Sequence, residues 1–178
     1  MATTTRRLVK CAVLAALYCA LTIACAPIAY GPIQFRVSEL LCVLPFFAPW
    51  TVWGLTVGCV LSNLLSPAGV WDLVLGPAAT LLAGLCTAGF GRVWRKTGTS
   101  TWRARILACL MPVIFNAAIV GSMLAALFPL AQGFWKSLPL SAAEVGLGEA
   151  AVMFLLGLPA ISLLPRAGIL KLLNDNGR

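Results

Sequence analysis

Residues 106–128 read ILACLMPVIFNAAIVGSMLAALF, an apolar block without a single charged side chain. An uncharged stretch of about 20 apolar residues is long enough to cross the hydrocarbon core of a bilayer as a helix. The rest of the chain has the same character, since 61% of its 178 residues are hydrophobic and only 10% are charged, against roughly 45–50% and about 25% in an average soluble domain. The composition therefore excludes a water-soluble globular fold and predicts an integral membrane protein.

The basic residues divide the chain into membrane-crossing intervals. There are 13 Lys and Arg against 5 Asp and Glu, a net charge of +8, and most basic residues fall into three groups: Arg6, Arg7 and Lys10; Arg92, Arg95, Lys96, Arg103 and Arg105; Arg166, Lys171 and Arg178. Short loops rich in Lys and Arg stay on the cytoplasmic side. We therefore expect an even number of crossings of the cell membrane between groups, with both termini in the cytoplasm. The membrane explains the positive charge, and no nucleic-acid partner is expected.

Turn signals set the number of spans at six. Residues 106–165 hold two apolar blocks, Ile106–Phe128 and Val145–Leu164, separated by a polar, proline-bearing loop around residues 132–141. Residues 11–91 are divided into four spans by turn signals at Pro27–Pro32, Pro45–Trp50 and Ser66–Val70. The sequence thus predicts an all-α integral membrane protein in which residues 1–178 form a single polytopic domain of six transmembrane helices.

The second and third blocks, residues 37–48 and 51–66, are short for a span. At about 1.5 Å per residue they reach roughly 18 to 24 Å, less than the ~30 Å hydrocarbon thickness. Either they stop partway through the membrane or the bilayer thins around them. Short, proline-bounded segments are also where transporters tend to form binding sites, because their free backbone groups line a cavity.

Missing residue types exclude several classes of function. The chain has no histidine, which excludes Ser-His-Asp and Cys-His catalysis and imidazole metal sites. Its seven cysteines are scattered through apolar stretches without a Cys-x-x-Cys pair, so we interpret them as small apolar side chains rather than metal or redox ligands. With no nucleophile paired with a base, we expect neither an enzyme nor a bound metal or cofactor.

Charged residues inside the apolar blocks are the candidates for a functional site, because a charge at the bilayer centre costs at least about 2.5–3.5 kcal/mol. The set expected near the outer ends of the second, fourth and sixth helices is Arg36, Glu39, Asp72 and Glu144, with Glu149 slightly deeper. Glu149 is the strongest candidate. It lies more than one turn inside the sixth helix between Gly146 and Gly148, whose missing side chains let a ligand or another helix approach.

Structural roles remain open for the other charged residues. Arg36 and Glu39 are three apart on one helical face, so a local ion pair is the alternative to ligand contact. Asp72 opens the fourth helix, where a carboxylate can cap free backbone N–H groups. Ser141-Ala-Ala-Glu144 has the pattern of a capping box, which favours a structural role for Glu144.

Two amides and an aromatic residue extend the candidate site. Asn116 lies midway along the fifth helix, and linear counting places Asn63 near the inner end of the third. Hydrogen bonding between helices is the alternative for both amides. Together with Phe35, the acids, the arginine and the amides suit a small, flat, polar heterocycle, because a carboxylate can accept two parallel N–H bonds.

The first helix carries a stripe of small residues at intervals of four: Ala12, Ala16, Ala20 and Ala24. We call these four residues the alanine stripe. Such a stripe lets a second helix come close. The spacing leaves two alternatives open, namely packing within this protein and a docking face for a partner subunit.

Several segments together resemble the QueT family. The most specific is YGPIQFRVSE at 30–39, followed by LPFF at 44–47, GCVLSN at 58–63, SPAGVWD at 66–72 and GPAATLLA at 76–83. QueT proteins are substrate-binding S components of energy-coupling factor (ECF) importers, assigned to precursors of the tRNA base queuosine. The resemblance implies an S-component-like bundle that binds a 7-deazaguanine, such as 7-aminomethyl-7-deazaguanine or queuine, from outside the cell.

The resemblance also implies partner subunits. The alanine stripe of the first helix would meet the coupling helices of a transmembrane T subunit, which two cytoplasmic ATPases drive. This chain contains no Gly-x-x-x-x-Gly-Lys-Ser/Thr phosphate-binding loop, so the energy for import must come from those partners.

The resemblance and the side-chain chemistry together imply roles for the candidate residues. Glu149 or Asp72 takes the hydrogen-bond donors of the purine edge, and Glu39, held by Arg36, orients the pocket. The remaining candidates bind the other edges or stack on the ring: Asn63, Asn116 and Gln34, and Phe35 or Trp71.

Three other functions are also compatible with the sequence. The chain could be an S component for another ligand, such as a vitamin. It could be a stand-alone proton-coupled transporter with Glu149 or Asp72 as the proton carrier. A scaffold protein without a ligand is the third alternative.

Overall fold

The computed structural model describes residues 2–31, 33–131, 133–166, 168 and 170–173, and every regular element in this part of the chain is a helix. In chain order the elements are α1 (Ala2–Ala24), α2 (Ala26–Ala29), η1 (Val37–Val43), α3 (Leu44–Phe47), α4 (Thr51–Asn63), α5 (Val70–Phe90), α6 (Arg92–Thr97), α7 (Trp102–Phe115), η2 (Asn116–Val120), α8 (Gly121–Leu127), α9 (Phe134–Val152), η3 (Met153–Gly157), α10 (Leu158–Leu163) and α11 (Leu170–Leu173). Pro32, Gln132 and Arg178, which entered the turn and charge arguments, lie outside the described residues.

Four helical stretches in the described residues are long and apolar enough to cross a membrane: Thr4–Ala24, Val70–Thr97, Trp102–Leu127 and Phe134–Leu163. The last three join α5 with α6, α7 with η2 and α8, and α9 with η3 and α10. The two remaining apolar blocks form the short helices Val37–Phe47 and Thr51–Asn63. The predicted all-helical membrane fold is confirmed, and four of its six predicted spans have the required length.

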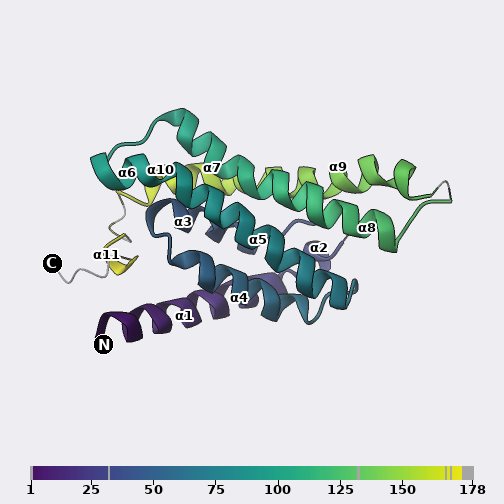
Figure 1. The fold of residues 1–178 in the computed structure, drawn as a ribbon, viewed down its shortest axis with the longest axis horizontal. Helices are drawn as coiled ribbons and strands as arrows, with labels where there is room; N and C mark the ends of the chain where they lie inside the picture. The colour runs from purple at the N-terminus through teal and green to yellow at the C-terminus, as the bar shows by residue number, and fades with distance from the viewer. Residues whose placement is uncertain (1, 32, 132, 167, 169, 174–178) are drawn as a thin grey trace.

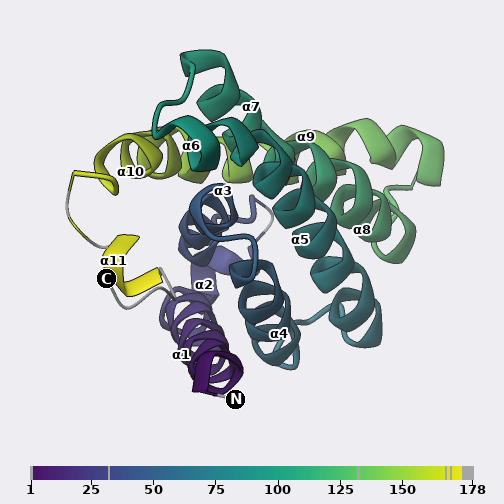
Figure 2. The same ribbon diagram turned by 60° about the vertical axis from the view of Figure 1, so that its left-hand side comes forward.

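The shorter helix Val37–Phe47 is enclosed by protein. Figure 2 shows α3 in the middle of the bundle, between α4, α5 and α10. Val43, Phe46 and Phe47 are buried there in one apolar cluster with Met153 and Ile161. Irregular or short backbone at membrane depth is tolerated where protein rather than lipid surrounds it. This burial explains how the block can be shorter than the hydrocarbon layer.

Successive long segments of the chain run in opposite directions along the bundle, as Figure 1 shows. α4 runs parallel to α1, because Cys11 Sγ donates to the carbonyl oxygen of Trp50 at 3.7 Å at one end, and the Tyr30 hydroxyl donates to that of Ser62 at 2.6 Å at the other. Glycines let the two helices approach closely. A Cβ at Gly54 would lie 2.9 Å from the carbonyl oxygen of Cys11, so only glycine fits this crossing without a shift.

Basic residues gather at one end of the bundle. The N-terminal end of α1, α6 and α10 all lie at this end in Figure 1. Arg95 donates to the carbonyl oxygens of Phe46 at 2.8 Å and Ala88 at 2.7 Å, which ties α3 to α5. Arg105 donates to the Ser162 hydroxyl at 3.2 Å, which ties α7 to α10. We call this the basic end, and it has the arrangement that an even number of crossings between basic groups requires.

α9 begins earlier than the sequence predicted. Its first residue, Phe134, follows Gly133, which has a φ of 87° and makes the turn. Ser137 holds this turn, since its hydroxyl accepts from the Leu130 N–H at 2.8 Å and donates to the Gly133 carbonyl at 2.9 Å. The predicted loop over residues 132–141 is therefore largely helical. The capping-box interpretation of Ser141 and Glu144 is wrong, because both residues lie inside a helix whose N–H groups already have partners.

Candidate functional site

A buried ion pair lies at the end of the bundle opposite the basic end. Arg36 Nη2 donates to Asp72 Oδ2 at 3.1 Å, and Arg36 Nη1 donates to Asn63 Oδ1 at 3.3 Å. Asn63 Nδ2 in turn donates to the backbone carbonyl of Asp72 at 2.9 Å. Three segments meet here: the residue before η1, the last residue of α4 and the first turn of α5.

This arrangement corrects three expectations. Within the described residues Arg36 is paired with Asp72 and not with Glu39. The carboxylate of Asp72 does not cap α5, because the cap position is Gly69 and no side-chain cap bond is made. Linear counting misplaced Asn63, which lies with Arg36 rather than at the Trp50 end, because α4 starts at Thr51 near Trp50 and ends at Asn63.

Glu39 has partners of its own. Its carboxylate accepts from the Tyr18 hydroxyl of α1 and from Cys42 Sγ at 2.9 Å. The neighbouring Ser38 accepts from Thr22 at 2.6 Å, which adds a second polar contact between α1 and η1. The expectation that Arg36 holds Glu39 is therefore wrong, because Tyr18 of α1 and Cys42 of the same η1 segment donate to the Glu39 carboxylate.

Glu149 lies deep in the bundle and is 2% exposed. The Asn116 side chain lies beside it, and Glu39 and Arg36 are close enough to interact with it electrostatically. Gly148 allows a close approach, since a Cβ there would overlap the backbone of Gln34. The sequence led us to expect the approach of a ligand or another helix, whereas the segment that approaches Gly148 is the non-helical stretch at Gln34. The structure thus brings Arg36, Asn63 and Asp72 into direct contact, and it places Glu149 and Asn116 together nearby.

Three buried polar side-chain atoms in the described residues have no hydrogen-bond partner: Arg36 Nε, Asp72 Oδ1 and Glu149 Oε1. All three belong to the predicted site. Leaving a buried polar atom unsatisfied costs about 1–3 kcal/mol, and more for a charged group. One of these atoms is a donor and two are acceptors, and the described residues supply no hydrogen-bond partner for any of them. Buried polar atoms that lack a protein partner are expected where a ligand binds.

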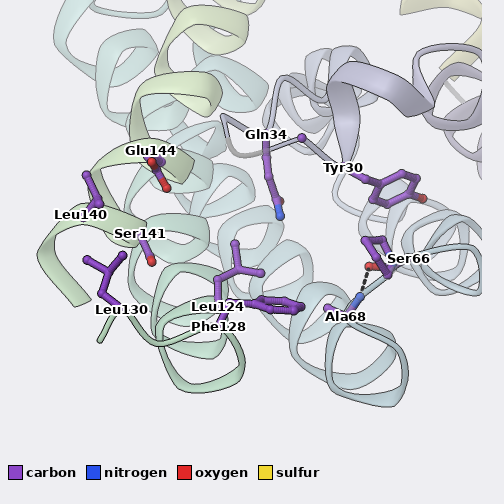
Figure 3. Close-up of a pocket in the computed structure, with 12 residues that line it drawn as sticks. Tyr30, Gln34, Ser66, Ala68, Leu124, Phe128, Leu130, Leu140, Ser141 and Glu144 are labelled. Carbon is purple, nitrogen blue, oxygen red and sulfur yellow. Dashed lines mark hydrogen bonds between the residues drawn. The ribbon is translucent and has the colours of Figure 1, made fainter. Parts of the chain in front are cut away.

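A cavity of about 400 Å³ opens beside this cluster. Its lining, drawn in Figure 3, consists of Tyr30, Gly31, Gln34, Ser66, Pro67, Ala68, Leu124, Phe128, Leu130, Leu140, Ser141 and Glu144. Small-molecule sites are commonly of this size, roughly 300–1,000 Å³. Tyr30 connects the cavity to the buried cluster, since its ring centroid lies 5.5 Å from the guanidinium of Arg36.

Sequence reasoning missed most of the cavity wall. Of the predicted site residues only Gln34 lines it, and Glu144 had been assigned to a cap. Tyr30 and Ser66 belong to the segments 30–39 and 66–72 that resemble the QueT family, but nothing in those segments distinguished these two residues as cavity-lining. Phe35 lines a separate shallow recess with Pro27 and Ile28. Trp71 is 61% exposed and lines another recess with Phe134. The structure does not bring these two aromatic residues to the cavity.

The alanine stripe faces outward. Ala12, Ala16, Ala20 and Ala24 are all exposed, whereas Ala15 and Tyr18 form the buried face against Gly58 of α4. Packing within this protein is therefore the wrong alternative for the stripe, because a different face of α1 serves that purpose.

Comparison with known proteins gives two matches. A family model described as QueT transporter matches residues 8–166. A curated relative from Lactococcus lactis subsp. cremoris (strain MG1363), named queuosine precursor transporter QueT, is 44% identical over 77 residues, which are 42% of this chain and 45% of the relative. The match thus spans less than half the length of that relative. No solved structure matches the chain.

Proposed function

Because the chain belongs to the QueT transporter family, we propose that it is the substrate-binding S component of an ECF importer and that it binds a queuosine precursor of the 7-deazaguanine class. The curated relative is named for a queuosine precursor, which supports the choice of substrate. Membership of a transporter family also indicates that the chain is not an enzyme.

The observation that carries the proposal is the set of unpartnered atoms at the buried cluster. A 7-deazaguanine presents adjacent N–H donors at N1 and the 2-amino group and a carbonyl acceptor next to them. Asp72 Oδ1 and Glu149 Oε1 are acceptors, and Arg36 Nε is a donor, for which the described part of the chain supplies no partner. Charge-assisted bonds to the ligand would satisfy them, each contributing about 1.5–3 kcal/mol when water is excluded. We assign the donor edge to the two carboxylates and the carbonyl to Arg36.

The cavity is the route to these atoms. Gln34 lines the cavity, and its backbone packs against Gly148, next to Glu149. Tyr30 lines the cavity, and its ring lies over the Arg36 guanidinium. A shift of these two side chains would connect the cavity to the buried acceptors, so we expect ligand binding to reorder both. We assign a positioning role to the two asparagines: Asn63 holds Arg36, and Asn116 holds Glu149.

We assign the basic end to the cytoplasm and the cavity end to the outside. The arrangement of the basic groups supports this orientation under the positive-inside rule, and it leaves both termini in the cytoplasm. The short helices Val37–Phe47 and Thr51–Asn63 complete a six-span bundle, with the first of them shielded from lipid by its neighbours.

We assign the alanine stripe to the T subunit, which two cytoplasmic ATPases drive. The outward face of Ala12, Ala16, Ala20 and Ala24 supports this role, since small residues allow close helix contact in a membrane. Because the chain has no phosphate-binding loop, import requires those partners.

A proton-coupled transporter is the second candidate, favoured by the buried Glu149 with its unpartnered oxygen beside Glu39. Uptake of tritiated 7-aminomethyl-7-deazaguanine into proteoliposomes separates the two. The S-component proposal predicts uptake only with the T subunit, both ATPases and internal ATP. Uptake by the chain alone that an uncoupler abolishes would instead establish the proton-coupled reading. Competition with a panel of vitamins tests the choice of substrate, and displacement by a vitamin but not by deazaguanines would refute it.

A further inference from the structure

The cavity has an uneven chemical lining. Much of its wall is apolar, with Leu124, Phe128 and Leu140 among the lining residues. Among the described lining residues the only charged side chain is Glu144. No lysine or arginine of this lining balances it, although the whole chain carries a net charge of +8. The cavity therefore presents an acidic side chain and no basic one among its described lining residues.

Glu144 reaches the cavity because α9 starts at Phe134. Ser141 and Glu144 are three residues apart, so they share one helical face, and both line the cavity. Figure 3 shows them on one wall, with Tyr30 and Ser66 on the opposite wall and Gln34 between them. The carboxylate is thus placed to meet a group that enters between the walls.

The same helix supplies the acid of the buried cluster. Glu149 is five residues further along α9 than Glu144, which corresponds to about 7.5 Å along the axis and roughly 140° around it. Glu149 is buried beside Asn116, whereas Glu144 is half-buried at the cavity. One helix therefore presents two carboxylates to two different sides of the candidate site.

In the described part of the chain no hydrogen bond or ion pair engages the Glu144 carboxylate. Asp72 is paired with Arg36, and Glu39 accepts from Tyr18 and Cys42. A carboxylate in a largely apolar cavity without a cation or donor is costly unless the occupant supplies one.

We propose that Glu144 is the specificity residue for the side arm at position 7 of the substrate, and that it selects a protonated primary amine over a neutral substituent. This inference rests on the proposed function. The side arm leaves the five-membered ring away from the N1–H and 2-amino edge. With that edge toward Asp72 and Glu149, the arm extends into the cavity. The rings of Tyr30 and Phe128 add faces that attract an ammonium group.

The test compares two ligands that differ in charge at the side arm. Equilibrium binding to the detergent-purified full chain is measured for 7-aminomethyl-7-deazaguanine and for the neutral nitrile 7-cyano-7-deazaguanine. Wild type should bind the amine more tightly. Glu144→Gln keeps the shape and removes the charge, so it should weaken amine binding about 10- to 100-fold and leave nitrile binding close to wild type. Retained nitrile binding also shows that the variant is folded.

Two further variants sharpen the comparison. Glu144→Asp keeps the charge and should retain part of the preference for the amine. Ser141→Ala, on the same wall, removes a neutral group and should change the affinity for both ligands by the same factor. If wild type binds both ligands without preferring the amine, or if Glu144→Gln changes both affinities equally, the role of Glu144 is refuted while the proposed function stands. If wild type binds neither ligand, the proposed function itself is refuted.

Discussion

Arg36 and Asp72 form an ion pair between Nη2 and Oδ2 at 3.1 Å, and both side chains are almost completely buried. The two residues are 36 positions apart in the chain: Arg36 directly precedes η1, and Asp72 lies in the first turn of α5. Each keeps one buried polar atom that finds no partner among the described residues, Nε of Arg36 and Oδ1 of Asp72. The pair therefore both joins the segments at this end of the bundle and leaves a donor and an acceptor for a ligand.

The first prediction concerns this ion pair. Asp72→Asn keeps the shape of the side chain but leaves the Arg36 charge buried without its counter-ion. Removing one partner of a buried pair costs about 3–5 kcal/mol. We expect the variant to unfold at a clearly lower temperature than wild type, followed by circular dichroism in detergent, and to lose binding of 7-aminomethyl-7-deazaguanine.

A double variant separates stability from binding. Arg36→Met with Asp72→Leu replaces the ion pair by apolar side chains, which is often neutral or stabilising. We expect its unfolding temperature to return toward that of wild type while ligand binding stays absent. Binding by the double variant would show that the pair is purely structural.

The second prediction concerns the contact between α9 and the segment before η1. In Gly148→Ala the new Cβ meets the backbone of Gln34, which cannot move without displacing the cavity wall. Overpacking of this kind costs about 1–3 kcal/mol, so both the unfolding temperature and the ligand affinity should fall. Gly89→Ala is the matched control, because no atom lies within 4 Å of its new Cβ. It should be as stable as wild type or more so. If Gly148→Ala and Gly89→Ala have the same unfolding temperature and the same ligand affinity, the close contact between Gly148 and the Gln34 backbone is contradicted.

The third prediction concerns the alanine stripe. Ala16→Leu adds bulk to the outward face of α1 without touching its buried face. It should prevent co-purification with the T subunit and leave binding of 7-aminomethyl-7-deazaguanine unchanged. Val13→Leu is the control, because Val13 is also exposed on α1 but is outside the stripe. If Ala16→Leu assembles as well as Val13→Leu, the stripe is not the docking face.

The fourth prediction concerns the orientation of the chain. Under the positive-inside rule we expect the basic end to lie in the cytoplasm. A green fluorescent protein fused to the C-terminus should therefore fluoresce, and alkaline phosphatase fused there should be inactive. The opposite pair of results would place the cavity on the wrong side for capture of an external ligand.

The convergence of the site could be predicted from the sequence, because the even-crossing rule fixes which helix ends lie together. Arg36, Asp72 and Glu149 stand out in apolar blocks, and that rule puts them at one end. The partners could not be predicted. Arg36 and Glu39 are three residues apart, but η1 directs them to different neighbours, and only the packing of α1 brings Tyr18 to Glu39.

The role of Glu144 shows a second limit of the sequence. Ser-x-x-Glu is a helix-start pattern, yet the same spacing also places two residues on one face within a helix. The choice depends on where α9 begins. Gly133, with its positive φ, and the hydrogen bonds of Ser137 set that start at Phe134. The sequence predicted a loop there because the stretch is polar and contains Pro139.

The most direct test of the central claim is saturation binding of tritiated 7-aminomethyl-7-deazaguanine to the purified chain. The unpartnered atoms of Arg36, Asp72 and Glu149 predict saturable binding with a Kd below about 10 μM, a binding free energy of about 7 kcal/mol or more. Glu149→Gln should weaken it, whereas Thr99→Ala, exposed near the opposite end of the bundle, should bind as wild type does. A wild-type chain that is folded but shows no saturable binding would contradict the account.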